Sequence, residues 1–398
     1  VQPPDGNHLE ESGGDGGMMW EIAKLGDISK NIQTGPFGSQ LHQSDYSECG
    51  IPVVMPKDLV GGKISEESIA RVDKTHVERL CRHKIEVGDI LYSRRGDVGR
   101  CAHVTKKEEG WLCGTGCLRV TIDSEKADSR FVFFQLQHPD TVGWVEKHAV
   151  GATMLNLNTT ILSSVPIRLP ALEIQKRIAD ILSAYDDLIE NNQKQIKLLE
   201  EVAQRLYKEW FVDLRFPGHE NTKIVDGVPE GWHWGLLQEL INVNYGKDHK
   251  KAPESGDVSV YGSGGLMRKC NKSLFSGEAV LIPRKGSLNN IMYVDETFWT
   301  VDTMFYATMK QPHTAIFVYF FVKSFDMYSM NIGAAVPSMT TKILDAMNVL
   351  IPKDEILGKF DKQAKVCFDK IKTLQRQNEQ LRKARDLLLP KLMSGEAV

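Results

Sequence analysis

Two basic tripeptides occupy matching places in this chain and carry side chains that bind anions or base edges. Arg94-Arg95-Gly96 and Arg284-Lys285-Gly286 each follow a short β-prone segment. Arginine and lysine donate hydrogen bonds to phosphates, and arginine also donates two parallel bonds to a guanine edge. The glycine in each tripeptide is typical of a turn that exposes its neighbours. The pattern favours nucleic-acid binding over acid–base or nucleophilic catalysis, and its simpler alternative is a solvated turn between strands.

Other polar residues near these tripeptides in sequence extend the two candidate clusters. The candidate DNA-contacting residues of the first block are Lys57, Arg94, Arg95, Arg100 and Lys106. Those of the second block are Tyr261, Ser263, Arg268, Lys269, Arg284, Lys285, Asn289 and Asn290. The loops 151–158 and 333–340 occupy matching places before the last strand of each block, so we expect them also to approach DNA or a protein partner.

The elements that position these residues are repeated along the chain. Ile167-Arg168-Leu169-Pro170 recurs as Val349-Leu350-Ile351-Pro352, and the offset between the two copies stays constant as far as Leu199 and Leu381. Toward the start of each block, from Trp20 to Trp232, the offset is larger. The repeat is too long for a solenoid unit of about 20–50 residues. It predicts a duplicated domain and helix, in which only the globular parts differ in length.

The globular parts are predicted to mix strands and helices. Turn glycines precede short strands at 88–93 and 277–282, and further short strands are expected at 53–54, 118–120, 291–293 and 304–306. The apolar runs 131–136 and 316–322 fit either a helix or a buried strand, because length alone does not separate the two.

Each block ends in a segment with the apolar spacing of a coiled-coil helix. In the first helix the stripe consists of Ile174, Ile178, Ile181, Tyr185, Leu188, Ile196, Leu199, Val202, Leu206 and Trp210. In the second it consists of Ile356, Phe360, Ala364, Cys367, Ile371, Leu374, Leu381, Leu388 and Leu392. Pro390 is expected to break or end the second helix. Because either stripe alone would face water, we expect the two helices to pair, and to do so antiparallel.

These elements give an α+β fold: two similar recognition domains separated by two long helices that pair as an antiparallel coiled coil, a pseudo-two-fold internal repeat. The predicted domains are 19–170 and 217–352, and the predicted helices are 171–216 and 353–398. Residues 1–18 contain five glycines and no lysine or arginine, so they are expected to be a disordered leader or a remnant of the expressed sequence.

Composition narrows the class of protein. The 398 residues are 41% hydrophobic and 25% charged, which is ordinary for a globular protein. Apolar runs are far shorter than the ~20 residues of a membrane span, and no signal peptide is recognised. Seven scattered cysteines favour reduced thiols and a cytoplasmic location. The net charge of −3 means that a DNA-binding chain must concentrate basic residues locally or share phosphate contacts with a partner.

Motifs for catalysis or metal binding are not recognised in the sequence. We find no phosphate-binding G-x-x-x-x-G-K-[ST], no H-E-x-x-H and no Asn-Pro-Pro or Asp-Pro-Pro aromatic motif of adenine methyltransferases. Cys113 and Cys117 with Cys101 have the wrong spacing for a zinc knuckle, so no metal site is predicted. The glycine-rich segment 262–265 fits a plain turn better than a phosphate loop.

The helical segments resemble a known family. The stretch from Ile181 to Phe211 is similar to the central conserved region of specificity (S) subunits of type I restriction–modification systems, and the stretch from Leu387 to Gly395 is similar to their distal conserved end. Pro229-Glu-Gly before Trp232-His-Trp234 resembles the usual opening of their second recognition domain. Segments 261–265, 283–286 and 302–303 resemble one class of that domain. The resemblance covers residues 19–398, and the leader has no counterpart.

The resemblance implies a function and a set of partners. Each recognition domain would read one half of a split site in double-stranded DNA, and the helices would set the unread gap. The helices would also bind two modification (M) subunits, which use S-adenosylmethionine, while motor-nuclease (R) subunits would use ATP and Mg²⁺. This chain would then need no cofactor and have no activity alone. The candidate partner-binding residues are Tyr185, Leu188, Leu199, Leu206, Trp210, Leu374, Leu381 and Leu388.

Two other hypotheses remain open from the sequence. The chain could be a methyltransferase or nuclease with an unrecognised active site, which binding of S-adenosylmethionine by the chain alone would reveal. It could instead be a helical scaffold that joins partners without reading DNA, which the absence of DNA crosslinks in the assembled complex would support. Two large domains with basic turns are more than a scaffold requires.

Overall fold

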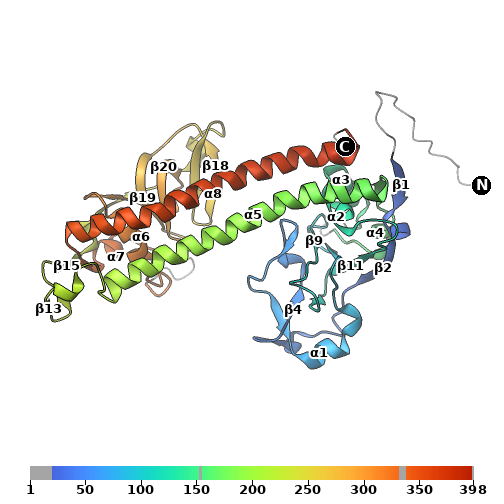
Figure 1. Cartoon of the computed structure of the whole chain (residues 1–398), viewed down its shortest axis with the longest axis horizontal. Coiled ribbons are helices and arrows are strands. Elements are labelled where there is room, and N and C mark those ends of the chain that lie inside the picture. The colour runs from blue at the N-terminus through green and yellow to red at the C-terminus, as the bar shows by residue number, and fades with distance from the viewer. Residues whose placement is uncertain (1–19, 152–154, 331–337, 397–398) are drawn as a thin grey trace, which may run out of the picture. The chain divides into compact units, whose positions relative to one another are not determined.

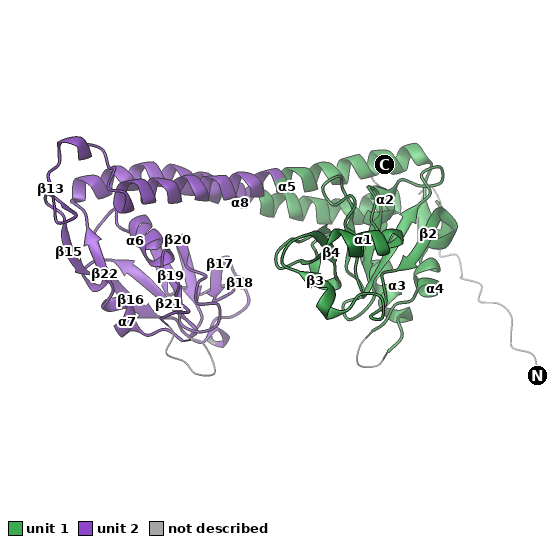
Figure 2. Cartoon of the chain, turned by 90° about the horizontal axis from the view of Figure 1, so that it is seen from below, with its two compact units in different colours: residues 1–190, 378–398 green, residues 191–377 purple. Residues whose placement is uncertain are grey.

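The structure, a computed structural model, describes residues 20–151, 155–330 and 338–396 (Figure 1). It divides into two compact units (Figure 2): unit 1 contains residues 1–190 and 378–398, and unit 2 contains residues 191–377. Both cuts fall inside the long helices, so each unit contains one globular domain and a segment of each helix. The sequence analysis instead divides the chain at the ends of the long helices. That division differs from the two compact units, and it stays a prediction. The predicted leader lies outside the described residues.

Unit 1 is built on two four-stranded sheets. The first has the antiparallel order β2-β11-β8-β9, with β2 (Ser29–Thr34), β8 (Ile90–Ser93), β9 (Cys101–His103) and β11 (Cys117–Ile122). The second has the order β10-β4-β7-β3, with β3 (Tyr46–Ser47), β4 (Ile51–Val54), β7 (Ala70–Val72) and β10 (Leu112–Cys113). Two short pairs complete it: β1 (Glu21–Lys24) with β12 (Pro166–Leu169), and β5 (Leu59–Val60) with β6 (Lys63–Ile64).

Four short helices accompany these sheets: α1 (Lys74–Arg79), α2 (Ser129–Gln137), α3 (Pro139–His148) and α4 (Thr159–Ser163). The sequence left the run 131–136 open between helix and strand, and the structure makes it part of α2. Asp128 caps this helix, because its carboxylate accepts hydrogen bonds from the backbone N–H groups of Arg130 and Phe131. The helix is buried from Phe131 to Leu136, so packing on both sides replaces an amphipathic pattern.

Unit 2 contains a six-stranded sheet of order β16-β21-β19-β20-β17-β18. Its strands are β16 (Ile241–Tyr245), β17 (Val258–Gly262), β18 (Gly265–Cys270), β19 (Phe275–Pro283), β20 (Met292–Thr300) and β21 (Met304–Met309). The pairs β13 (Ile224–Val225) with β14 (Val228–Pro229) and β15 (His233–Leu236) with β22 (Asn348–Ile351) flank it. The helices are α6 (Ala315–Lys323) and α7 (Thr341–Asp345). The second ambiguous apolar run, 316–322, is thus helical too.

The duplication is visible in matching hydrogen bonds inside the two units. The backbone N–H of Leu25 donates to the carbonyl oxygen of Val165 at 2.9 Å, and that of Leu237 donates to Met347 at 2.8 Å. Both leucines are fully buried. The helix–strand pair α4–β12 recurs as α7–β22, at the constant offset that the sequence predicts. The predicted internal repeat is therefore confirmed at the level of individual backbone contacts.

The long helices are α5 (Leu172–Tyr207), followed by one π-helical turn at Lys208–Val212, and α8 (Asp354–Ser394). In unit 1 an Arg385 guanidinium nitrogen lies 2.5 Å from a carboxylate oxygen of Asp186. In unit 2 the rings of Tyr207 and Phe360 lie 6.3 Å apart. Within each unit, an early segment of one helix therefore meets a late segment of the other (Figure 1), which confirms the antiparallel pairing. No helix in the described part of the chain is long and apolar enough to cross a membrane.

Two details of the helix prediction are wrong. Pro390 lies inside α8 instead of ending it, because a proline one turn from the helix end removes little backbone bonding while Leu392 and Met393 stay buried in unit 1. Leu188 and Val202 are exposed, although both were placed on the apolar stripe. The buried face of α5 runs through Leu182, Ile189, Ala203 and Tyr207 instead.

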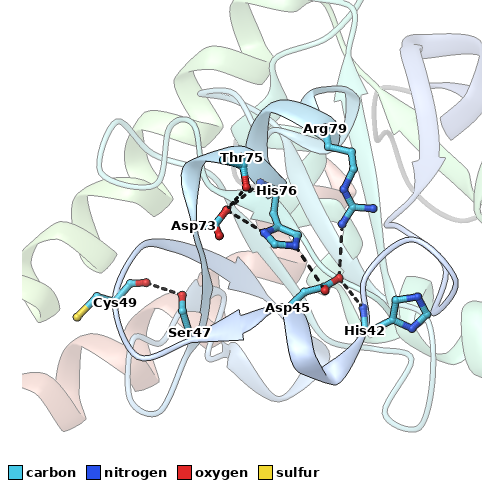
Figure 3. A network of polar contacts seen from close by, with 8 residues as sticks. All are labelled: His42, Asp45, Ser47, Cys49, Asp73, Thr75, His76 and Arg79. Atoms are coloured by element: carbon cyan, nitrogen blue, oxygen red, sulfur yellow. Dashed lines mark hydrogen bonds and ion pairs between the residues drawn. The ribbon is translucent and has the colours of Figure 1, made fainter.

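A polar network ties the second sheet of unit 1 to α1 (Figure 3). The His76 ring lies between two carboxylates, with Nδ1 2.8 Å from Asp73 and Nε2 3.4 Å from Asp45. A hydrogen bond from the backbone N–H of His42 lowers the pKa of Asp45, with a smaller contribution from His76. Hydrogen bonds from Thr75 and His76 lower the pKa of Asp73. The network fixes the start of α1, because the Asp73 carboxylate accepts a hydrogen bond from the backbone N–H of His76.

Two glycines in equivalent loops should tolerate no side chain. A Cβ on Gly35 would lie 2.0 Å from the carbonyl oxygen of Gly114, and one on Gly246 would lie 2.0 Å from that of Val301. We expect Gly35→Ala and Gly246→Ala each to cost about 1–3 kcal/mol of unfolding free energy, because the backbone must move. Thermal unfolding measures this. Gly38→Ala is the control, since no atom lies within 4 Å of its Cβ; equal losses would contradict the close approach.

Acid should destabilise unit 1 through His83, which is buried, and His103, which is partly buried. Burial lowers the pKa of His83 and of His103 to about 4. Above the usual histidine pKa of about 6.5, both histidines are neutral in the folded and in the unfolded chain. Between that pH and about 4, only the unfolded chain takes up a proton at these histidines. Stability should fall by roughly 1.4 kcal/mol per pH unit per histidine, down to pH about 4. Urea unfolding from pH 7.5 to 4.5 tests this. His103→Gln should flatten the slope and the exposed-site variant His233→Gln should not; identical slopes would refute the assignment.

Candidate nucleic-acid interface

The first basic tripeptide lies where β8 ends, in a turn fixed by backbone hydrogen bonds. The N–H of Arg94 donates to the carbonyl oxygen of Gly116 at 2.8 Å, and the N–H of Gly96 donates to Leu155 at 3.1 Å. The carbonyl oxygen of Arg94 accepts from the N–H of Leu157 at 2.8 Å. We call residues 94–100 the unit 1 arginine turn. These bonds hold the backbone in place and leave the arginine side chains to act outside the sheet.

The second tripeptide follows β19 and has the same backbone arrangement. The N–H of Arg284 donates to the carbonyl oxygen of Thr303 at 2.8 Å, and the N–H of Met339 donates to that of Arg284 at 2.9 Å. Lys285 forms an isolated β-bridge with Ser338, as Arg95 does with Asn156. Residues 284–290 are the unit 2 arginine turn. The two turns are equivalent structures at equivalent places in the duplicated domains.

Both turns need glycine and an apolar anchor. Gly96 has φ of +75° and Gly286 has φ of +84°, in the left-handed region that other residues rarely adopt. Two residues later the side chains of Val98 and Leu288 are fully buried and fix each turn to its domain. The turns therefore have defined shapes, which is what recognition of a base edge requires.

Each turn places its first arginine beside an aromatic ring. The guanidinium carbon of Arg94 lies 5.9 Å from the ring centroid of Phe37, and that of Arg284 lies 5.6 Å from the ring centroid of Tyr245. These distances allow cation–π attraction. Arg284 also donates from Nη1 to the carbonyl oxygen of Asp302 at 3.1 Å. The ring contact limits how far the guanidinium can swing.

The structure brings together the three arginines of the first predicted cluster, and Lys57 and Lys106 lie in other surroundings. Arg95 is exposed beside Arg94, and Arg100 closes the same turn with its Nε 2.6 Å from Asp97. Lys57 donates to the carbonyl oxygen of Ser68 at 2.9 Å, so its ammonium group is engaged there. Lys106 follows β9, whose end pairs with the start of β8, and so lies at the opposite end of β8 from the turn. Lys106 is therefore near the arginine turn in sequence but not in the fold, and its contact with DNA stays a prediction.

In unit 2 the hairpin between β17 and β18 joins the arginine turn. The Asn290 side-chain amide donates to the carbonyl oxygen of Ser263 at 2.8 Å, and a Cβ on Gly286 would lie 2.8 Å from the Ser263 hydroxyl. The glycine-rich segment 262–265 forms the hairpin turn, which confirms the predicted turn. Lys269 lies exposed on β18. Ser263, Arg284, Lys285 and Asn290 thus form one continuous group.

Three other predicted residues of unit 2 have structural partners. Arg268 donates from Nη2 to the carbonyl oxygens of His249 and Ala252, at 2.6 and 2.8 Å. Asn289 donates to Asp326 at 2.9 Å and accepts from the N–H of Met327. The Tyr261 hydroxyl donates to Glu296 at 2.6 Å. These bonds explain all three residues as supports of the domain. Of loops 151–158 and 333–340, residues 152–154 and 333–337 lie outside the described residues.

The sequence interpretation missed the aromatic and glycine residues of these sites. Phe37 and Tyr245 are 52% and 54% exposed, so both rings lie at the surface. Gly35 and Gly246 end the first strand region of each sheet and pass close to a neighbouring carbonyl group. A usable signal existed, because each glycine lies within two residues of an aromatic residue.

The predicted partner-binding residues of the helices divide into buried and accessible ones. Trp210 and Leu374 are only 5% and 2% exposed, so both side chains are buried within this chain, and their contact with a partner stays a prediction. Both were chosen from spacing alone, and Trp210 belongs to the core of unit 2. Tyr185, Leu199, Leu206, Leu381 and Leu388 are half-buried, and Leu188 is exposed. The sequence interpretation missed the exposed apolar residues Leu198, Val366 and Leu387.

Three cysteines of unit 1 are buried thiols. Burial raises the pKa of Cys101 and Cys113 to about 12, and that of Cys117 well above its usual value, so these thiols stay protonated. Among the residues that the structure describes, no group of three or more His, Cys, Asp or Glu side chains could hold a metal ion.

Comparison with known proteins agrees with this arrangement. The type I restriction enzyme MjaIX specificity subunit of Methanocaldococcus jannaschii is 26% identical, over 95% of this chain and 93% of its own length. The HindI specificity subunit of Haemophilus influenzae is 23% identical, over 95% and 99%. A crystal structure of a type I restriction–modification S subunit from M. genitalium shares the fold, with a TM-score of 0.61, 18% identity and coverage of 97% and 98%.

A family model locates both halves of the repeat. The type I restriction modification DNA specificity domain matches residues 18–201 and again residues 229–386. Each match includes one globular domain with its arginine turn and most of the long helix that follows. Since the two matches cover well over half of the residues, the chain belongs to the family of type I restriction–modification DNA specificity proteins.

Proposed function

We propose that this chain is the sequence-specificity subunit that selects DNA for a type I restriction–modification complex, with each unit reading one half of a bipartite site. The observation that carries the proposal is the arginine turn, which occurs in both units with the same backbone bonds, buried anchor and left-handed glycine. A turn needed only to connect strands would not require basic residues at the same two positions. Duplicated readers suit a ligand with two separated recognition elements.

The long helices serve as spacer and assembly surface in this proposal. Their pairing sets the gap between the two half-sites, and they bind two M subunits that hold S-adenosylmethionine. The R subunits supply ATP- and Mg²⁺-dependent translocation and cleavage, so this chain needs no cofactor or catalytic residue of its own. Exposed Leu188, Leu198, Val202 and Leu387 support the assembly role, because apolar side chains on an outer helix face gain stability when a partner covers them.

The charge balance supports shared contacts with DNA. The chain has a net charge of −3, so it lacks the general basic surface of a protein that binds DNA alone. Basic side chains at the two turns suffice to select a sequence if partner subunits provide most phosphate contacts. The scaffold hypothesis would not account for two equivalent turns, and no observation favours it.

Methylation mapping tests the proposal directly. The chain is co-expressed with its M subunit in a host without other adenine methylation, and methylated adenines are mapped by single-molecule sequencing. We expect two short specified blocks around a fixed unspecified gap. Methylation at one continuous short motif would mean that a single unit reads DNA. A stable complex that methylates no motif would contradict the proposal.

Single substitutions in the turns should separate base readout from phosphate contact. Arg94→Ala or Arg284→Ala should weaken binding of the assembled complex to its own site by about 1–3 kcal/mol, with little change on random DNA. Competition binding at several salt concentrations measures both. Lys106→Ala is the control, because this exposed lysine lies away from the turn. Equal losses on specific and random DNA, with a shallower salt dependence, would make the arginine a phosphate contact.

A further inference from the structure

We propose that Phe37 and Tyr245 are specificity residues, each holding its arginine so that the guanidinium reads a guanine, and that both half-sites therefore contain a G·C pair. The inference rests on the proposed function and extends it to the chemistry of the ligand. Its basis is the pairing of Arg94 with Phe37 and of Arg284 with Tyr245. The guanidinium carbons lie 5.9 and 5.6 Å from the respective ring centroids.

The two rings reach their arginines by different routes. Gly35 and Gly246 are equivalent, because the N–H of Gly35 donates to Cys117 at the start of β11, and the N–H of Gly246 donates to Met304 at the start of β21. Phe37 comes two residues after its glycine, whereas Tyr245 comes one residue before its glycine. Inheritance from a common ancestral domain would keep the ring on one side. The two rings instead reach equivalent arginines from opposite sides of the equivalent glycine. This favours a functional need for the contact.

Neither ring is needed chiefly to fill a core. Both are more than half exposed, and neither belongs to a buried cluster of its unit. Tyr245 touches Phe305 edge-on at 5.0 Å, which orients the ring while leaving much of it at the surface. An exposed aromatic ring beside an arginine favours a fixed guanidinium plane, because attraction to the ring face reduces the rotamers that the side chain visits.

The guanidinium groups keep donors for a ligand. Among the described residues, no hydrogen bond or ion pair from the Arg94 guanidinium is present, and its Nε is buried without a partner. Arg284 commits Nη1 to the carbonyl oxygen of Asp302. Arg130 and Arg385, by contrast, are bound to aspartates. The arginines beside the rings thus have donors to spare.

The ligand that matches such an arginine is the major-groove edge of guanine. Guanine presents two acceptors, O6 and N7, spaced to receive two parallel N–H bonds from one guanidinium. A phosphate contact positions the protein but carries no sequence information, whereas the edge of a base must be met in its own plane. Fixing both arginines therefore favours guanine, and predicts the same requirement in two half-sites whose remaining bases differ.

The test uses the complex of the full chain with its M subunit and duplexes containing the mapped site. Each half-site guanine is replaced in turn by 7-deazaguanine, which lacks the N7 acceptor. We expect one replacement in each half-site to weaken DNA binding by the wild-type complex at least several-fold. Arg94→Ala should abolish that sensitivity in one half-site only, and Arg284→Ala in the other, because the bond to N7 is already absent.

Variants of the rings test the positioning role. Phe37→Leu and Tyr245→Leu should each weaken specific binding about two- to fivefold and reduce the 7-deazaguanine effect in the matching half-site. Tyr245→Phe keeps the aromatic ring, so the complex with this variant should bind DNA as the wild-type complex does. Trp234→Leu removes an exposed aromatic residue of β15 and should change nothing.

The outcomes distinguish this inference from the proposed function. A split motif with no guanine in one half-site, or binding insensitive to 7-deazaguanine at every position, would overturn the guanine assignment while leaving the specificity role intact. Retention of the full 7-deazaguanine effect in both leucine variants would overturn the role of the rings. Absence of any split motif would instead remove the proposed function itself.

Discussion

The burial of apolar surface between each globular domain and the helix segments of its own unit is the constraint on which the rest of the structure depends. In unit 2 the Phe211 ring lies 4.8 Å from Phe317 of α6 and 4.9 Å from Phe360 of α8. In unit 1 Ile178 and Leu182 of α5 share a core with Phe131 of α2. The largest apolar cluster of each unit includes residues of both helices. Each arginine turn is consequently held on a rigid support that the helices complete.

This shared core explains why the two turns keep one geometry while the surrounding loops differ. Val98 and Leu288 anchor the turns inside, and the bonds to Leu157 and Met339 fix their outer side. The sheets around them have different numbers of strands, four and six. The interior of the duplicated unit is therefore constrained, while the surface near the turns is free to vary. A family of domains that recognises different DNA sequences needs this combination of a constant core and a variable surface.

The repeat and the paired helices were easier to predict from the sequence than the contacts of individual side chains. Constant spacing from Ile167 to Leu199 and from Val349 to Leu381 identified the repeat and the paired helices, because a helix preserves register along its whole length. The arginine turns were found because turn glycines mark strand ends. The surroundings of Lys106 and Arg268 could not be predicted, since nearness in sequence does not say which end of a strand a loop occupies or which carbonyl groups a side chain meets.

The aromatic contacts lay beyond the reach of sequence patterns for a related reason. Phe37 and Arg94 are far apart along the chain, and their contact depends on the order in which the strands pair. Tyr245 meets Arg284 because β16 and β19 both pair with β21. Strand order is a property of the folded sheet, so spacing within one segment does not reveal it.

The placement of both unit boundaries inside the helices also affects how the chain is made. Unit 2 is continuous in sequence, from Asn191 to Gln377, whereas unit 1 needs residues from Asn378 onward to complete it. Leu392 and Met393, which are buried in unit 1, are translated after all of unit 2. At about 5–20 residues per second, the apolar surface of unit 1 waits roughly 10–40 s for its last helix segment. The domain translated first is thus the one whose last helix segment is translated last.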